Sequence, residues 1–203
     1  IASGQDWFGE PVREPCGVVY IAAEGWQTIG RRIIAAKRAR GIPDTVHLPL
    51  ALPRWSSVCL TMDGRKNIDG FDRVGRGCRA IHEHFMATFG VRLGVGVLDT
   101  VSSACPMRDE NSNAEVAKVV GVLAELWQAL DICLVGVHHF GKNQESGLRG
   151  GAAWRANCDH SRIFLTDREA VSDEIRNRRM MLEKNRLGKE GQTYGYELAE
   201  TIF

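Results

Sequence analysis

Three short, mostly apolar runs, each followed at once by polar residues, limit what this chain can fold into more than any other feature of its sequence. The runs are Gly17–Ala23, Val91–Leu98 and Ile132–Val137, and segments with helical periodicity separate them. Apolar residues without alternation are typical of strands buried on both faces, as in a parallel sheet covered by helices. The sequence therefore predicts an α/β fold with a mostly parallel, twisted sheet and helices on both faces.

The segments between and after these runs complete the predicted architecture. Helical spacing of apolar residues predicts helices at Trp26–Arg40, at Asp72–Phe89 and from the end of the polar loop Met107–Asn113 to about Leu130, and Val46–Leu50 is predicted to be a short strand. The C-terminal third differs, because it alternates in the manner of antiparallel strands at Ser161–Thr166, Arg179–Glu183 and Tyr194–Leu198. No internal repeat or linker is visible, so we expect a single domain over residues 1–203 with a C-terminal antiparallel extension.

The charge balance and the cysteines exclude several classes of protein. Twenty-six Lys and Arg against 25 Asp and Glu give a net charge of +1, which excludes a uniformly basic nucleic-acid coat but not a local basic patch. No run approaches the roughly 20 apolar residues that cross a bilayer. The six cysteines are scattered without a Cys-x-x-Cys pair, and Cys133 lies in an apolar run where a buried side chain is expected. A cytoplasmic protein without a membrane partner is therefore predicted.

Polar residues end all three apolar runs. Glu24 follows the first run, Asp99 follows the second, and His138 and His139 follow the third. Ligands of open α/β sheets bind at the carboxyl ends of the strands, so these residues together predict one shared site. Taken singly, each of them could simply be the polar residue at which a strand ends.

Two of these residues carry the carboxylates that phosphate chemistry needs. The strand that ends at Asp99 has the form of a Walker B strand, whose carboxylate holds Mg²⁺ directly or through water. Glu24 precedes Gly25 and could polarise the water that attacks a γ-phosphate. Apolar strands that end in Asp are nevertheless common, and Glu24 would equally suit the positive end of the following helix.

The order of these motifs resembles the RepA-type branch of RecA-like ATPases. The matching segments are Trp7–Gly9, Tyr20–Gly25, Asp99–Thr100 and Val137–Lys142. In that family a P-loop strand and helix come first, and the Trp-Phe-Gly segment, the Glu-bearing strand, the Walker B strand and a His-ended sensor strand follow. The resemblance covers nearly the whole chain, and it implies a RecA-like ATPase core with ATP as substrate and Mg²⁺ as cofactor.

The resemblance also implies roles for individual residues at the strand ends. Glu24 matches the catalytic glutamate that activates water, and Asp99 matches the Walker B aspartate that holds Mg²⁺. His139, or alternatively His138, matches the sensor that reports the γ-phosphate to the DNA-binding loops. The other explanation for two adjacent histidines is that one is buried and hydrogen-bonded while the other is solvated.

A cationic segment near the C-terminus resembles the finger segment of related ring ATPases. Lys184 and Arg186 match the Lys and Arg fingers that reach the nucleotide of the neighbouring subunit. Cationic donors suit this role because they stabilise charge on the transferring phosphoryl oxygens. An exposed, charged hairpin turn explains the same residues without any function.

Two loops match the DNA-binding loops of RecA-like proteins in position. The loop Gly141–Gly151 carries Lys142 and Arg149 and directly follows the sensor strand, where cations and backbone amides would hold phosphates. The loop Met107–Asn113 matches the first DNA-binding loop, although its Arg-Asp-Glu segment is not basic. Both loops could equally be surface loops without a ligand.

The sequence departs from the family in one respect, because Gly-x-x-x-x-Gly-Lys-Ser/Thr occurs nowhere in its 203 residues. That loop cradles the β- and γ-phosphates. In the family it lies shortly before the Trp-Phe-Gly segment, so we expect that this chain begins inside the helix that follows the loop.

The combined prediction is Mg²⁺-dependent ATP hydrolysis coupled to binding or translocation on single-stranded DNA, in a homo-oligomeric ring such as a hexameric RepA-like replicative helicase. One alternative is a RecA-like recombination or repair ATPase that does not unwind DNA. A second alternative is a degenerate, non-catalytic nucleic-acid-binding module. A metal hydrolase built on Asp99, His138 and His139 lacks a ligand cluster with suitable spacing.

Overall fold

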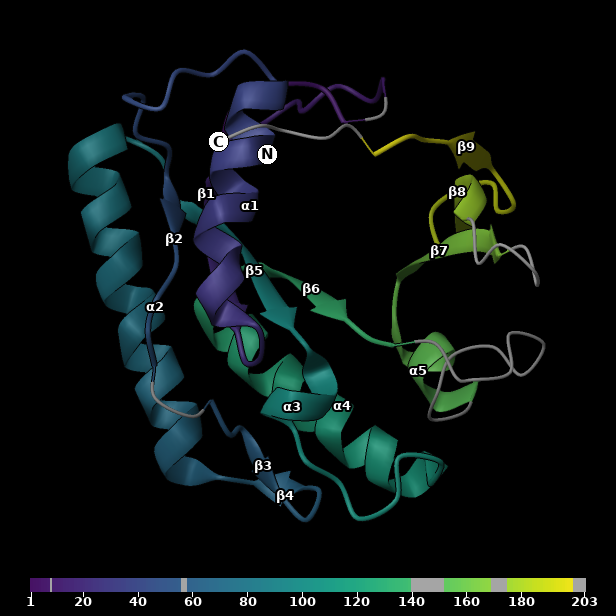
Figure 1. The fold of residues 1–203 in the computed structure, drawn as a ribbon. Coiled ribbons are helices and arrows are strands. Elements are labelled where there is room, and N and C mark those ends of the chain that lie inside the picture. Colours follow the sequence, from purple (N-terminus) through teal and green to yellow (C-terminus); the bar gives the residue numbers. More distant parts are fainter. Residues whose placement is uncertain (8, 56–57, 140–151, 169–174, 199–203) are drawn as a thin grey trace. The chain divides into compact units, whose positions relative to one another are not determined.

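The chain folds into two compact units, Ile1–Trp154 and Arg155–Phe203, and each is described by itself. The computed structural model describes residues 1–7, 9–55, 58–139, 152–168 and 175–198 (Figure 1). Within these residues, no helix combines the length and the apolar composition that a membrane span requires. The expectation of a single domain over residues 1–203 stays a prediction.

A four-stranded, all-parallel sheet organises the first unit. Its strands are β1 (Gly17–Ala22), β2 (Leu50–Ala51), β5 (Leu93–Asp99) and β6 (Cys133–Val137), in the spatial order β2-β1-β5-β6. The two central strands β1 and β5 are almost entirely buried, as their uninterrupted apolar sequences require. Because all four strands are parallel, their carboxyl ends meet at one edge of the sheet.

Helices cover both faces of this sheet (Figure 1). They are α1 (Trp26–Ala39), α2 (Ile68–Phe89), the short α3 (Val101–Ala104) and α4 (Asn113–Leu130). Helix α2 contacts β1, β5 and α4, so α2 and α4 share one face, while α1 crosses the other face. Right-handed crossovers between parallel strands produce this division. The predicted fold class, a parallel α/β sheet with flanking helices, is confirmed and agrees with a RecA-like core.

The core lies between the sheet and the pair α2 and α4. Trp127 of α4 is only 4% exposed, and its ring covers Gly96 of β5 so closely that a Cβ atom there would lie 2.6 Å from the indole. Helix α2 begins at Asn67, whose side chain accepts a hydrogen bond from the Gly70 amide. It ends at Gly90, which adopts a left-handed conformation. The packing of Trp127 on Gly96 fixes β5, the strand that ends in the predicted site.

The remaining elements are antiparallel. A small hairpin in the first unit pairs β3 (Thr61–Met62) with β4 (Arg65–Lys66). The second unit forms a three-stranded sheet of β7 (His160–Arg168), β8 (Ile175–Asn185) and β9 (Thr193–Gly195), while α5 (Ala152–Asn157) spans the boundary between the units. The predicted C-terminal antiparallel extension is therefore confirmed.

The predicted strand at Val46–Leu50 was misplaced. Strand β2 starts only at Leu50, because the residues before it form other hydrogen bonds. The Val46 amide donates to Pro43, and the Lys37 ammonium binds the carbonyl oxygens of Asp44 at 2.9 Å and Val46 at 2.8 Å. The backbone of residues 44–46 is thus held by the end of α1, and the segment meets the sheet at Pro49, whose carbonyl oxygen accepts a hydrogen bond from the Val18 amide at 2.8 Å.

The prediction that β6 is buried on both faces was also wrong. Val135 and Val137 are 44% and 37% exposed, and Cys133 is exposed rather than buried. Cys133, Val135 and Val137 alternate along β6 and so share one face, and this face is exposed at the edge of the sheet, where β6 pairs with β5 alone among the described strands. An apolar sequence therefore predicted the strand correctly and its burial incorrectly.

Candidate functional site

The carboxyl ends of β1, β5 and β6 bring the predicted strand-end residues to one edge of the sheet. Glu24 follows β1 by two residues, and Asp99 is the last residue of β5. The amides of Ala23 and Glu24 both donate to the Asp99 carbonyl oxygen, at 2.6 and 3.3 Å. These backbone bonds tie the turn after β1 to the end of β5 and so fix the position from which the Glu24 side chain projects.

The Glu24 carboxylate is held at both of its oxygens. The Ser103 hydroxyl donates to Oε2 at 2.7 Å, and Nε2 of His139 lies 3.2 Å from Oε1. The hydrogen bond from Ser103 and then that from His139 hold the pKa of Glu24 below its ordinary value, because both favour the charged form. Glu24 is thus an ionised, oriented acceptor whose side chain remains 46% exposed to solvent.

Ser103 was not among the residues singled out from the sequence. Thr100, which is 1% exposed, caps α3 by accepting a hydrogen bond from the Ser103 amide at 3.4 Å. The Thr100 hydroxyl also donates to the Ser103 hydroxyl at 3.1 Å, which orients Ser103 toward Glu24. The available signal was the spacing Thr-x-x-Ser directly after the strand-ending Asp99, which is typical of a helix N-terminus.

The Asp99 carboxylate has a partner within the sheet. The Tyr20 hydroxyl of β1 donates a hydrogen bond to Oδ2 of Asp99. Partial burial, followed by the hydrogen bond to Asp99, raises the pKa of Tyr20 well above its ordinary value, so the phenol stays protonated and remains a donor.

The two adjacent histidines point to different partners. His139 contacts Glu24, whereas the His138 ring lies against Trp154 with a centroid separation of 5.1 Å. Nδ1 of His138 donates to the His139 carbonyl oxygen at 2.9 Å. The structure therefore brings His139, and not His138, to the predicted catalytic carboxylate.

The donors at this edge suit Mg²⁺. No group of three or more His, Cys, Asp or Glu that could hold a metal occurs within the described part of the chain. Mg²⁺ needs no such group, because it commonly binds one or two carboxylates together with water and substrate phosphates. The carboxylate of Asp99 and the hydroxyl of Ser103 are hard oxygen donors of the kind that this ion prefers.

The predicted finger residues lie in the second unit and have local partners there. The Lys184 ammonium donates to the carbonyl oxygens of Arg155 and Ala156, at 2.6 and 3.1 Å. Arg186 forms an ion pair with Asp159 at 2.7 Å, and its side chain is 58% exposed. Lys184 lies in β8, and Arg186 follows the last residue of that strand.

The predicted DNA-loop residues are only partly described. Lys142 and Arg149 lie outside the described residues. In the other loop, Arg108 pairs with Asp63 at 2.8 Å, and Oε2 of Glu115 accepts hydrogen bonds from the Arg108 and Asp109 amides. That loop is held by Asp63, between β3 and β4, and by Glu115 of α4, and its one arginine forms an ion pair.

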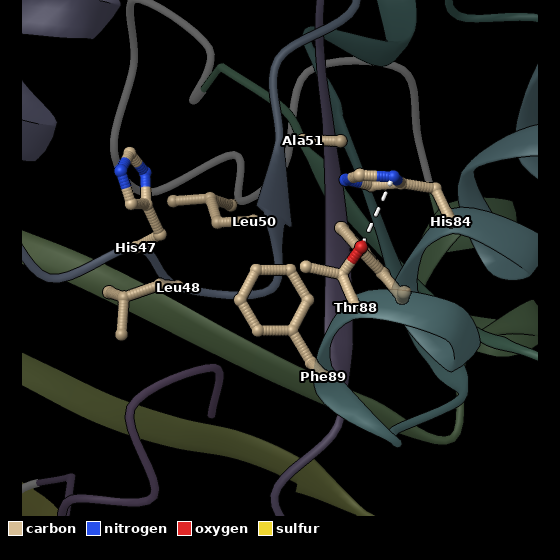
Figure 2. Close-up of a pocket in the computed structure, with 8 residues that line it drawn as sticks. His47, Leu48, Leu50, Ala51, His84, Thr88 and Phe89 are labelled. Atoms are coloured by element: carbon tan, nitrogen blue, oxygen red, sulfur yellow. Dashed lines mark hydrogen bonds between the residues drawn. The ribbon is translucent and has the colours of Figure 1, made fainter.

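A cavity of about 480 Å³ lies elsewhere in the first unit (Figure 2). It is bounded by the chain leading into β2 and by the last turns of α2, and its lining residues are His47, Leu48, Leu50, Ala51, His84, Phe85, Thr88 and Phe89. The Thr88 hydroxyl and Nδ1 of His84 lie 3.4 Å apart inside it. None of the predicted site residues lines this cavity, so it is separate from the strand-end site.

Comparison with known proteins identifies the family of the first unit. A family model described as AAA domain matches residues 1–145, which contain the whole parallel sheet together with Glu24, Asp99, His138 and His139. A search of curated proteins found no match. With a match over well more than half of its length, the chain belongs to the AAA domain family, a family of nucleotide-hydrolysing P-loop ATPases.

Proposed function

We propose that this chain is the core of a Mg²⁺-dependent ATPase that couples hydrolysis to binding or translocation on single-stranded DNA, as a RepA-like replicative helicase. The observation that carries the proposal is the Glu24 carboxylate, oriented by Ser103 and His139 at the edge where Asp99 ends its strand. The residues of this arrangement come from the ends of the three strands β1, β5 and β6. Polar residues that only terminate strands would not need to contact one another.

In the proposed reaction, Glu24 polarises the water that attacks the γ-phosphate and accepts its proton. An ionised carboxylate with two fixed oxygens still has free lone pairs, so it can accept from water while Ser103 and His139 hold its orientation. Because the side chain is 46% exposed, water and substrate have access to it. Proton transfer to a positioned side chain typically contributes about 10²–10⁴-fold to a rate.

Asp99 is the residue that would hold Mg²⁺, directly or through water. When bound, the ion neutralises charge on the β- and γ-phosphates. His139 would act as the sensor, because its ring contacts the carboxylate that faces the γ-phosphate. The segment that directly follows His139 in the sequence carries Lys142 and Arg149, our candidates for contacting DNA phosphates.

We expect single-stranded DNA to stimulate ATP hydrolysis by the full-length protein several-fold, because DNA binding next to His139 would favour the arrangement of Glu24 that activates water. Steady-state phosphate release, measured with and without a poly-dT oligonucleotide, tests this expectation. Duplex DNA of equal charge is the control for nonspecific electrostatic effects.

A strand-displacement assay separates a helicase from a recombination or repair ATPase, since the latter would load onto single strands without displacing a complementary strand. Absence of hydrolysis would favour the degenerate binding module.

We further propose that the active protein is a homo-oligomeric ring, with six copies as the expected number. Lys184 and Arg186 lie in one segment at the end of β8, and would donate to the phosphates held by a neighbouring copy. Their ion pair and carbonyl contacts within the second unit would then be exchanged for the nucleotide. Mass photometry of the full-length protein with ATPγS and Mg²⁺ should show a species of six copies, and a monomer under all nucleotide conditions would contradict the ring.

A further inference from the structure

The Tyr20 phenol and the Asp99 carboxylate share one face of the sheet. The parallel register places Tyr20 opposite Val97 and Ala22 opposite Asp99. Residues two apart in a strand project from the same face, so the side chains of Tyr20 and Asp99 point to the same side and meet diagonally across β1 and β5. The Tyr20 hydroxyl donates a hydrogen bond to Oδ2, which is one of the two oxygens of the Asp99 carboxylate.

This hydrogen bond makes the two oxygens of Asp99 unequal. Oδ2 accepts the proton of Tyr20, whereas no donor from the described residues is seen at Oδ1. A phenol carries a single donor proton, and its bond to a charged acceptor is stronger than a bond between neutral groups. The bond therefore restrains the rotation of the carboxylate and leaves one oxygen for a ligand.

We propose that Tyr20 is a positioning residue, which fixes the Asp99 carboxylate so that Oδ1 alone is presented to the metal–nucleotide complex. This inference rests on the proposed function. Mg²⁺ demands nearly ideal octahedral geometry, so a carboxylate held in one orientation suits it better than one that rotates. The phenol acts through Asp99 and contributes no metal ligand of its own.

The test compares the full-length wild-type protein with Tyr20→Phe, which keeps the ring and removes only the hydroxyl. Mn²⁺ replaces Mg²⁺ as the probe, and its binding in the presence of ADP is measured by electron paramagnetic resonance. We expect Tyr20→Phe to lower Mn²⁺ affinity by about 10–100-fold, the loss typical of a hydrogen-bond partner of a metal-ligating group. Raising the Mg²⁺ concentration should restore ATP hydrolysis toward the wild-type kcat, because the lesion lies in metal binding.

Tyr194→Phe is the matched control. Its hydroxyl lies 3.4 Å from the Gln192 side chain in the second unit, so the same atom is removed far along the chain from Asp99. Mn²⁺ affinity of this variant should stay within about twofold of wild type, the range expected for a surface change without a special role.

A double-mutant cycle separates positioning from damage to the fold. If Tyr20 acts through Asp99, then Tyr20→Phe should change Mn²⁺ affinity by less than about twofold in an Asp99→Asn background. An equal loss in both backgrounds would show a general structural defect and would overturn the inference. Wild-type affinity in Tyr20→Phe would overturn it too, while the proposed function would stand. A wild-type protein that binds no Mn²⁺ with nucleotide would overturn both.

Discussion

Replacing Glu24 by glutamine should lower the kcat of ATP hydrolysis by at least about 100-fold, since the amide cannot accept a proton from the attacking water. Glutamine has the shape of glutamate, and its amide oxygen can still accept the hydrogen bond that Ser103 donates at 2.7 Å. The variant therefore removes the proton acceptor and keeps the packing. The measurement is steady-state phosphate release at saturating ATP and Mg²⁺, with the full-length protein.

The same variant should bind nucleotide with nearly unchanged affinity, because Glu24 acts on the water rather than on the ground-state nucleotide. A loss confined to kcat is the signature of an interaction made in the transition state. Glu83→Gln is the matched control, since Glu83 is exposed on α2 and its side chain forms no hydrogen bond or ion pair with another described residue. If Glu24→Gln hydrolyses ATP at the wild-type rate, the assignment of the catalytic carboxylate is wrong.

Trp127→Ala should destabilise the first unit by about 3–5 kcal/mol, the range for truncating a large aromatic residue in a packed core. The ring is 4% exposed and fills the space above Gly96, which has no side chain of its own to close the gap. Denaturant unfolding followed by tryptophan fluorescence reports on this unit, because Trp154 is the last tryptophan in the sequence.

Two further variants sharpen this measurement. Met62→Ala removes a side chain that is 65% exposed, so its free energy of unfolding should stay within about 0.5 kcal/mol of wild type. Trp127→Phe retains an aromatic ring and removes an indole N–H that is buried and has no partner among the described residues. Its loss should therefore be smaller than that of Trp127→Ala. A loss below about 1 kcal/mol in Trp127→Ala would contradict the described packing of α4 on β5.

The strands that build the site could be predicted from the sequence because their apolar runs are long and end sharply. The runs that end before Glu24 and Asp99 became β1 and β5, with boundaries within two residues of the prediction. The edge position of β6 could not be predicted, since an apolar strand has the same sequence whether or not a neighbour covers it. Exposed Val135 and Val137 show this limit directly.

The partners of the site residues were harder to predict from the sequence than the site residues themselves. Tyr20 contacts Asp99 from β1, and Ser103 contacts Glu24 from α3, the short helix that follows β5. Such contacts depend on register and on side-chain direction, which composition and periodicity do not encode. Composition and periodicity also do not distinguish His139 from His138, because both are histidines at adjacent positions. The contact with Glu24 depends on which side chain faces that carboxylate.

The contacts of Glu24 also determine when the site can exist during folding. Its two partners, Ser103 and His139, lie 79 and 115 positions further along the chain. Pairing of strands so distant in sequence forms slowly, because a long loop must close before any contact is gained. A nascent chain that has not yet docked β6 lacks the His139 contact of Glu24, so full hydrolytic activity should appear only after the whole sheet has assembled.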